Sequence, residues 1–217
     1  MNELLMDNWS SWVHIAGTLA FATTAVLAVA PRGIDLFGAT TLGIITAIGG
    51  GTIRDIILQV PVFWANAQYY IWLAAGASVI TFYANSLLTR KYINMLILHV
   101  DAIGVSLFAI QATHKVWKLG FAMPFIGPLT LGIITAIGGG LIRDVLAGRQ
   151  TLLMSRELYA IPIMLGCVLF ILILNYLPAY DFVGSLISIA LIYALRAAAI
   201  HKNLTVPNWM AISPKEN

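Results

Sequence analysis

Two segments of the chain share a pattern of residue types that handles charge: three consecutive glycines, two intervening residues, an arginine and an aspartate. The pattern consists of Gly49, Gly50, Gly51, Arg54 and Asp55 in the first segment and Gly138, Gly139, Gly140, Arg143 and Asp144 in the second. Aspartate attracts cations, whereas arginine beside free backbone amides binds carboxylates. The pattern therefore indicates the binding or passage of a small charged solute, and it leaves open whether that solute is a cation or a carboxylate.

The two segments are copies of each other. Residues 41–57, TLGIITAIGGGTIRDII, and residues 130–146, TLGIITAIGGGLIRDVL, are identical at 14 of 17 positions and are offset by 89 residues. A weaker match at an offset of 87 relates Gly17, Phe21 and Ala22 to Gly104, Phe108 and Ala109. We infer an internal duplication in which the second unit is two residues longer.

The elements that carry the motif are predicted to be membrane helices. The chain has 217 residues, of which 60% are hydrophobic and 10% charged, whereas about 25% are charged in a typical soluble domain. The apolar residues fall into runs of roughly 20, the length that an α-helix needs to cross a bilayer. We predict an all-α polytopic membrane protein with seven transmembrane helices at residues 11–30, 36–58, 69–88, 93–114, 123–148, 157–177 and 180–200.

The distribution of cations predicts how these helices are oriented. Alternate connections hold Arg32, Arg90, Lys91, Arg149, Arg156, Arg196, Lys202 and Lys215. The other set of connections holds only Lys115 and Lys118. Because lysine and arginine near helix ends favour the cytoplasmic side, the N-terminus is expected outside and the C-terminal tail in the cytoplasm. The same topology explains the isoelectric point near 9.1 without any nucleic-acid partner.

The duplication predicts an inverted repeat within a single transmembrane domain, residues 1–217. With three helices in each unit, repeat 1 (11–88) and repeat 2 (93–177) must enter the membrane from opposite sides, and a seventh helix (180–200) and a cytoplasmic tail (201–217) follow. In proteins built this way, the path of the solute commonly lies where the two repeats meet.

The glycine triplets have two interpretations. Gly43, Ala47 and Gly51 recur at every fourth residue, which is typical of a stripe along which another helix packs closely. That stripe accounts for one glycine of each triplet, and each glycine weakens a helix by about 1 kcal/mol relative to alanine. We therefore expect a kink or a short unwound segment in helices two and five, which implies a wet cavity beside it.

The charged residues after the triplets also have two interpretations. An ionised side chain near the bilayer centre costs about 2.5–3.5 kcal/mol, so Arg54 and Arg143 need compensation. They either extend to the head groups or line the solute path as two gates, roughly 15–20 Å apart by the helical rise. Adjacent residues point about 100° apart on a helix, so we expect their partners on other helices or in water.

Helix four adds a third acidic residue, Asp101, near mid-membrane. An intramembrane carboxylate is a functional candidate by default. The alternative is a structural hydrogen bond to His14 or to a hydroxyl group of the first helix, which has Thr18, Thr23 and Thr24. Near the other end of the chain, Tyr193 and Arg196 are expected at the membrane interface, without a chemical role.

With these features, the sequence resembles the prokaryotic branch of the trimeric intracellular cation (TRIC) channels and the related bacterial membrane proteins labelled glycine transporters. The resemblance rests on the paired GGGxxRD motif on helices two and five of seven, and it covers residues 10–200. It implies a homotrimer in the prokaryotic inner membrane, with one pore per protomer bounded by kinked helices two and five. It also implies conduction of monovalent cations, chiefly potassium, with potassium binding only transiently near the kinks.

The resemblance assigns the ion pathway to the two motifs and to Asp101. In the animal channels, a lysine-containing motif that engages phosphoinositide follows the first kink, but this chain has Thr52, Ile53, Arg54 and Asp55 there. The sequence therefore does not support phosphoinositide control, and it leaves open a bound lipid of another kind.

A secondary transporter of a small amino acid such as glycine is the alternative function, since backbone amides and an arginine suit a carboxylate. An enzyme is not expected. The four histidines, at positions 14, 99, 114 and 201, are scattered, and the sequence has neither a metal-ligand spacing nor a phosphate loop. We accordingly expect no cofactor and no structural metal, and Cys167 is expected to be a buried residue without a role.

Overall fold

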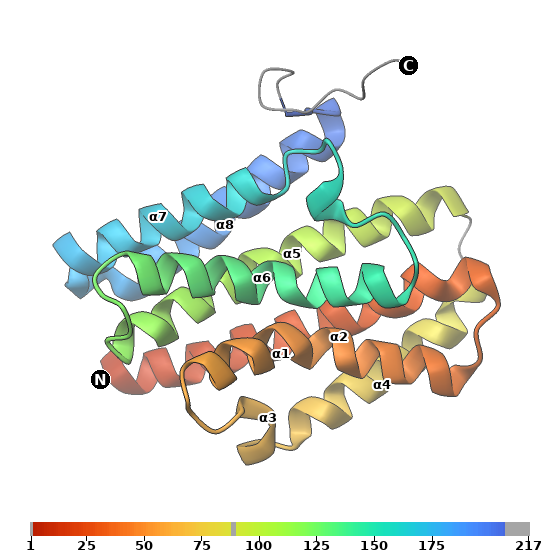
Figure 1. Ribbon diagram of the computed structural model, residues 1–217, viewed down its shortest axis with the longest axis horizontal. Helices are drawn as coiled ribbons and strands as arrows, with labels where there is room; N and C mark the ends of the chain where they lie inside the picture. Colours follow the sequence, from red (N-terminus) through yellow and green to blue (C-terminus); the bar gives the residue numbers. More distant parts are fainter. Residues whose placement is uncertain (1, 88–89, 207–217) are drawn as a thin grey trace, which may run out of the picture.

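The protein is a bundle of antiparallel helices (Figure 1). The computed structural model describes residues 2–87 and 90–206, which form eight α-helices and four short 3-10 turns. The α-helices are α1 (Asn2–Val29), α2 (Leu36–Ile57), α3 (Phe63–Asn66), α4 (Tyr69–Ala84), α5 (Arg90–Lys118), α6 (Ile126–Leu146), α7 (Ala160–Tyr176) and α8 (Asp181–Lys202). The end of the predicted tail, residues 207–217 with Lys215, lies outside the described residues.

Five of the described helices are long and apolar enough to cross a membrane: α1, α2, α5, α6 and α8. Two more, α4 and α7, are apolar but have only 16 and 17 residues. At a rise of 1.5 Å per residue, such a helix is about 25 Å long, somewhat less than the hydrocarbon thickness. The all-helical prediction is therefore confirmed, and all seven predicted segments are helical. The four-residue helix α3 was not predicted.

Helices α2 and α6, which carry the two motifs, run in opposite directions and pack against each other. Helix α5 packs against both α1 and α6, while α4 lies against α1 and α2. Helices α7 and α8 pack against each other and against α5. The N-terminus of α1 and the C-termini of α2 and α5 lie at one end of the bundle, here called the N-terminal end (Figure 1).

Both motif helices end directly after their arginine and aspartate. After α2, the amide of Val60 donates to the carbonyl oxygen of Asp55 at 3.1 Å. After α6, the amide of Arg149 donates to the carbonyl oxygen of Asp144 at 2.8 Å. These bonds satisfy carbonyl groups that the end of a helix otherwise leaves unpaired. Each charged pair is thereby fixed at the point where its helix gives way to a loop, with the triplets one turn further inside.

Both helices remain continuous through the glycine triplets, so the expectation of an unwound segment is wrong. The physical reason is that an intact helix pairs its own amides and carbonyls, which an unwound segment inside the bundle cannot do without other partners. A kink in helices two and five, the other form of that expectation, stays a prediction. The neighbours of the three consecutive glycines, which pack closely against them, give another explanation for the triplet.

Candidate functional site

Each glycine of a triplet faces a different neighbour, and together they allow contact on three sides of the helix. A side-chain carbon at Gly50 would collide with the carbonyl oxygen of Thr135, and one at Gly139 would lie 2.6 Å from that of Thr46. These two close approaches are equivalent in the two repeats. The helix backbones therefore meet at the triplets, which only glycine permits.

The outer glycines of the triplets serve other contacts. A side-chain carbon at Gly49 would lie 2.6 Å from the side chain of Ile142 on α6, and one at Gly51 would lie 2.7 Å from the ring of Phe63. At Gly138 the nearest atom is the Cα of Gly50, whereas Gly140 faces the charged residues near its own helix end. Close packing thus requires glycine at Gly50 and Gly139, and the other four glycines of the triplets also have close neighbours.

The first charged cluster, here called the Arg54 cluster, lies toward the N-terminal end of the bundle and is built around two fully buried residues of α2. The Nε atom of Arg54 donates to Oδ1 of Asp55 at 2.8 Å, and its Nη1 atom donates to Oε1 of Gln111 at 2.8 Å. Lys115 brings its Nζ atom to 2.7 Å from the same Asp55 oxygen. The amide of Phe63 donates to Oδ2 of Asp55 at 2.9 Å. Two cations therefore share one carboxylate.

The second charged cluster, here called the Arg143 cluster, lies toward the opposite end and is built around α6. The Nε atom of Arg143 donates to Oδ1 of Asp144 at 2.8 Å. Its Nη1 atom donates to Asp101 Oδ1 at 2.8 Å and to Thr24 Oγ1 at 3.0 Å. The amide of Leu152 donates to Oδ2 of Asp144 at 3.2 Å. Here two carboxylates share one arginine.

The two clusters are copies of one arrangement. At the offset of 89, the arginine and the aspartate of one cluster match those of the other. The amide that donates to the aspartate also matches, since Phe63 corresponds to Leu152. At the offset of 87, Gln111 matches Thr24, and each of these accepts from Nη1 of the arginine in the other repeat. The duplicated sequence thus builds the same contacts twice, with each arginine bound to a helix of the opposite repeat.

The two clusters differ at two matching positions. Asp101, which binds Arg143, matches His14 at the offset of 87, and Lys115, which binds Asp55, matches Ala28. With neutral histidine, Arg54, Asp55 and Lys115 leave one positive charge. The corresponding residues Arg143, Asp144 and Asp101 leave one negative charge. The hydrogen-bonded core of the two clusters therefore differs in net charge, and Arg149 and Glu157 also line the cavity beside Asp144.

Several expectations from the sequence require correction here. The interpretation that the arginines extend to the head groups is wrong, because Arg54 and Arg143 are 0% and 1% exposed. Adjacent arginine and aspartate do pair with each other, in addition to partners on other helices, since the long arginine side chain spans the angle between them. The partner of Asp101 is Arg143 rather than His14, and Thr24 takes part by accepting from the same guanidinium.

Arg196 was expected at the interface and is instead completely buried. Its Nη1 atom donates to the carbonyl oxygen of Leu158 at 3.0 Å, and its guanidinium lies 4.6 Å from the ring centre of Tyr159. A side-chain carbon at Gly140 would meet the Tyr159 hydroxyl at 3.3 Å and Asp101 Oδ1 at 3.4 Å. Tyr159 thus connects Arg196 to the Arg143 cluster, a role that no sequence pattern indicated.

A cavity opens beside each cluster. The cavity at the N-terminal end has a volume of about 470 Å³, and His14, Gln111 and Lys115 form part of its wall. The cavity at the opposite end has a volume of about 240 Å³ and is lined by Arg143 and Asp144, among others. The two cavities share no lining residue.

Packed side chains occupy the region between the two cavities. Phe21 of α1 and Phe108 of α5, which match at the offset of 87, stack with ring centres 5.4 Å apart and planes 12° apart. Along their helices these residues lie between the groups of the two clusters, at the level where Gly50 and Gly139 meet. Toward the N-terminal end, His14 lies 5.7 Å from Phe108, measured between ring centres. The aromatic stack therefore belongs to the buried core that lies between the groups of the two clusters.

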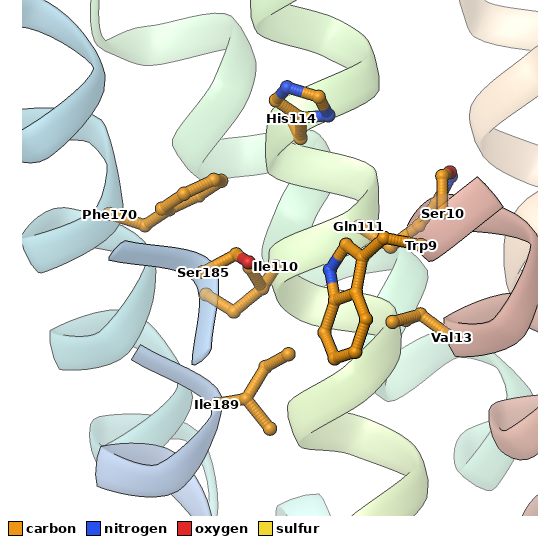
Figure 2. A pocket seen from close by; sticks show the side chains of 9 residues that line it. All are labelled: Trp9, Ser10, Val13, Ile110, Gln111, His114, Phe170, Ser185 and Ile189. Carbon is orange, nitrogen blue, oxygen red and sulfur yellow. The ribbon is translucent and has the colours of Figure 1, made fainter. Parts of the chain in front are cut away.

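Figure 2 shows a narrow side pocket, which shares three lining residues with the larger cavity. It has room for about one water molecule, and Ser10, Gln111 and His114 line both spaces. Its other residues come from α1, α5, α7 and α8, and they are Trp9, Val13, Ile110, Phe170, Ser185 and Ile189. The larger cavity thus extends sideways toward the last two helices. Cys167 is buried as expected, and the described residues contain no cluster of three or more residues that could ligate a metal.

The fold and the paired clusters define an integral membrane protein with the architecture of TRIC channels. A TRIC channel orthologue from Rhodobacter sphaeroides superposes with a TM-score of 0.83 at 29% identity, covering 90% of this chain and 98% of that one. The description of the glycine transporter family matches residues 11–86 and 98–175, and the chain belongs to that family.

Curated relatives agree with this assignment. The inner membrane protein YadS of Escherichia coli is 31% identical over 204 residues, which cover 91% of this chain and 95% of YadS. The membrane protein YvgT of Bacillus subtilis is 34% identical over 158 residues, which cover 71% of this chain and 75% of YvgT. These similarities extend across both repeats.

Proposed function

We propose that the protein is a monovalent cation channel, chiefly for potassium, that assembles as a homotrimer with one pore in each protomer. The supporting observation is the pair of matching charged clusters on either side of the contact between Gly50 and Gly139. We place the pore along α2 and α6, with seven membrane crossings once α4 and α7 are included. The N-terminal end would face outward from an inner membrane.

In this proposal the structure represents a closed state. Each arginine is held by a carboxylate and by a polar residue of the opposite repeat, so movement of one repeat against the other alters both clusters together. Separation of the Phe21 and Phe108 rings, with a bend at the triplets, would join the two cavities. Cations would concentrate near Asp101 and Asp144, where carboxylates outnumber the arginine.

Planar bilayer recording tests the channel proposal directly. We expect discrete unitary potassium currents from the purified protein, and we expect Arg143→Ala to change the conductance while the oligomer remains intact on size-exclusion chromatography. Wild-type protein that gives no unitary currents, or Arg143→Ala with an unaltered conductance, would contradict the proposed roles of the channel and of Arg143, respectively.

A secondary transporter for a small amino acid such as glycine is the second candidate. The glycine transporter family description supports it, as does the larger cavity, whose wall includes Lys115 and Lys118. Its test is uptake of radiolabelled glycine into liposomes. Saturable uptake without unitary currents would favour the carrier, and currents without uptake would favour the channel.

A further inference from the structure

The residues that follow α8 fold back onto the loop between α6 and α7, which reaches the C-terminal end of α8 (Figure 1). Asn203 adopts a left-handed backbone conformation, with φ 48° and ψ 44°, which ends the helix and turns the chain. Residues 204–206 then run antiparallel to residues 156–158, and Thr205 pairs with Glu157 in a single β-bridge. Asn203 together with residues 204–206 is here called the terminal strap, and it ties the end of the last helix to the loop.

Two backbone hydrogen bonds hold the terminal strap against the loop. The amide of Leu158 donates to the carbonyl oxygen of Leu204 at 3.3 Å, and the amide of Val206 donates to that of Arg156 at 2.8 Å. The strap is mostly exposed to solvent. Segments that combine exposed backbone hydrogen bonds with little buried apolar surface open more readily than the core of a protein. The strap can therefore be released while the bundle stays folded.

The loop is also fixed from the interior of the bundle. The Nη1 atom of Arg196, which is completely buried, donates to the carbonyl oxygen of Leu158 at 3.0 Å. The backbone of Leu158 is thus bound on two sides, by the strap through its amide and by α8 through its carbonyl. In the last turn of α8, the ring of His201 lies 5.1 Å from that of His99 on α5, measured between ring centres. The end of α8 is therefore anchored, and the strap is the part of this contact that lies at the surface.

The loop that the strap holds forms one wall of the smaller cavity, which has a volume of about 240 Å³. Four of its residues line the cavity, namely Arg149, Gln150, Leu152 and Glu157, and the other lining residues belong to α5 and α6. Glu157 is the bridge partner of the strap. The amide of Leu152 donates to Oδ2 of Asp144 at 3.2 Å. The loop thus connects the strap both to the cavity wall and to the Arg143 cluster.

We propose that the terminal strap restricts entry to the smaller cavity. While the strap is paired with residues 156–158, it holds the loop against the Arg143 cluster. When the strap is released, the loop moves away from Asp144 and the entrance to the cavity widens. The movement itself does not depend on which solute crosses the membrane, whereas its effect on conduction rests on the proposed channel function.

Modification of a thiol in the purified protein tests the movement of the loop without any measurement of current. Ile97 of α5 lines the smaller cavity and is 3% exposed, so Ile97→Cys provides a reporter, while the native Cys167 is buried. On this background, Val206→Pro removes the amide that donates to Arg156, and Val206→Ala keeps that amide as the matched control.

We expect Val206→Pro to raise the rate at which a charged methanethiosulfonate modifies the reporter thiol by about fivefold or more, the change in population that loss of one hydrogen bond produces. Val206→Ala should react at the rate of the reporter protein alone. Equal rates in all three proteins would overturn the proposal.

Hydrogen exchange on the chain without the reporter gives a second test, which holds if Ile97→Cys does not fold. In Val206→Pro, the amides of Leu158 and Leu152 should both exchange faster than in the wild type. The amide of Phe63, which donates to Asp55 in the other repeat, is the internal control and should be unchanged. Faster exchange at Leu158 alone would overturn the proposal, because the release of the strap would then not reach the Arg143 cluster.

Planar bilayer recording separates the strap from the proposed channel function. We expect Val206→Pro to raise the open probability by about fivefold and Val206→Ala to leave it unchanged. Faster thiol modification with an unchanged open probability would overturn the control of conduction by the strap. If the wild type gives no currents, the channel function is contradicted, and the thiol and exchange measurements still decide whether the strap restricts the cavity.

Discussion

Arg143 and Asp101 are joined at 2.8 Å across 42 residues of sequence, and this ion pair binds the two central helices α5 and α6 together. Both side chains are buried, so each partner neutralises a charge that would otherwise lie in a medium of low dielectric constant. The equivalent position in the other repeat lacks the carboxylate. The pair is therefore the clearest point at which the two halves of the molecule differ.

Removing one member of this pair should destabilise the protein. We expect Asp101→Ala to lower the free energy of unfolding by about 1.5–3 kcal/mol, because it removes a charge-assisted hydrogen bond from Arg143, which keeps Asp144 as its second carboxylate partner. Thermal unfolding monitored by fluorescence-detected size-exclusion chromatography measures the loss. The double variant Asp101→Ala with Arg143→Ala should lose less than the sum of the two single variants. Additive losses would show that the pair is not coupled.

Close approach at the triplets predicts a sharp difference between glycines. Gly139→Ala should lower the melting temperature strongly, because its new carbon would lie 2.6 Å from the carbonyl oxygen of Thr46 and would force α2 and α6 apart. Gly76→Ala on α4 is the matched control, since nothing lies within 4 Å of its new carbon. There, alanine should be neutral or stabilising by up to about 1 kcal/mol. Equal melting temperatures for the two variants would contradict the packing role of the triplet.

The aromatic stack at the centre predicts an effect on leakage. Phe21→Ala should raise the potassium flux through liposomes that contain the protein, because it removes one of the two rings that stack in the buried core between the two clusters. It should also destabilise the fold by about 3–5 kcal/mol, as is usual for truncation of a buried phenylalanine. Phe37→Ala, at a ring that is 80% exposed, serves as the control. An unchanged flux through folded Phe21→Ala protein would exclude the stack as the barrier.

Arg196 is predicted to hold the segment before α7 in place. Arg196→Met should loosen residues 149–159, because it removes the hydrogen bond to the Leu158 carbonyl and the contact with the Tyr159 ring. Arg196→Lys keeps the charge but loses the planar group that stacks on the ring, so it should give an intermediate result. Limited proteolysis of this segment measures the change. Identical cleavage rates for the wild type and Arg196→Met would contradict the prediction.

The sequence predicted the helices well because apolar runs of membrane length are a strong signal. All seven predicted segments are helical, although α4 and α7 are shorter than expected and the four-residue α3 carries too little periodicity to be recognised. The sequence also placed Arg54, Asp55, Arg143 and Asp144 as the charged residues that need partners. That need follows from the cost of ionised groups in an apolar bundle.

The partners themselves were not predictable from spacing. Helical periodicity predicts that adjacent side chains point apart. Arg54 nevertheless pairs with Asp55, because the guanidinium lies at the end of a long flexible side chain that reaches around the helix. Gln111 is 57 residues from Arg54 and was not assigned to it. The offset of 87 held the missing information, since it relates Gln111 to Thr24 and His14 to Asp101.

By itself, the amino-acid sequence determined that the protein is an all-α membrane protein with a duplicated, charged glycine motif. Apolar runs, the distribution of cations and the internal repeat can all be read from residue types along the chain, without knowing which segments pack together. Only the tertiary structure decided that the triplets are contact points along continuous helices and that the hydrogen-bonded core of the two charged clusters differs in net charge. Such contacts depend on how far each helix is rotated and where it crosses its neighbours, and these quantities arise only when distant segments pack together.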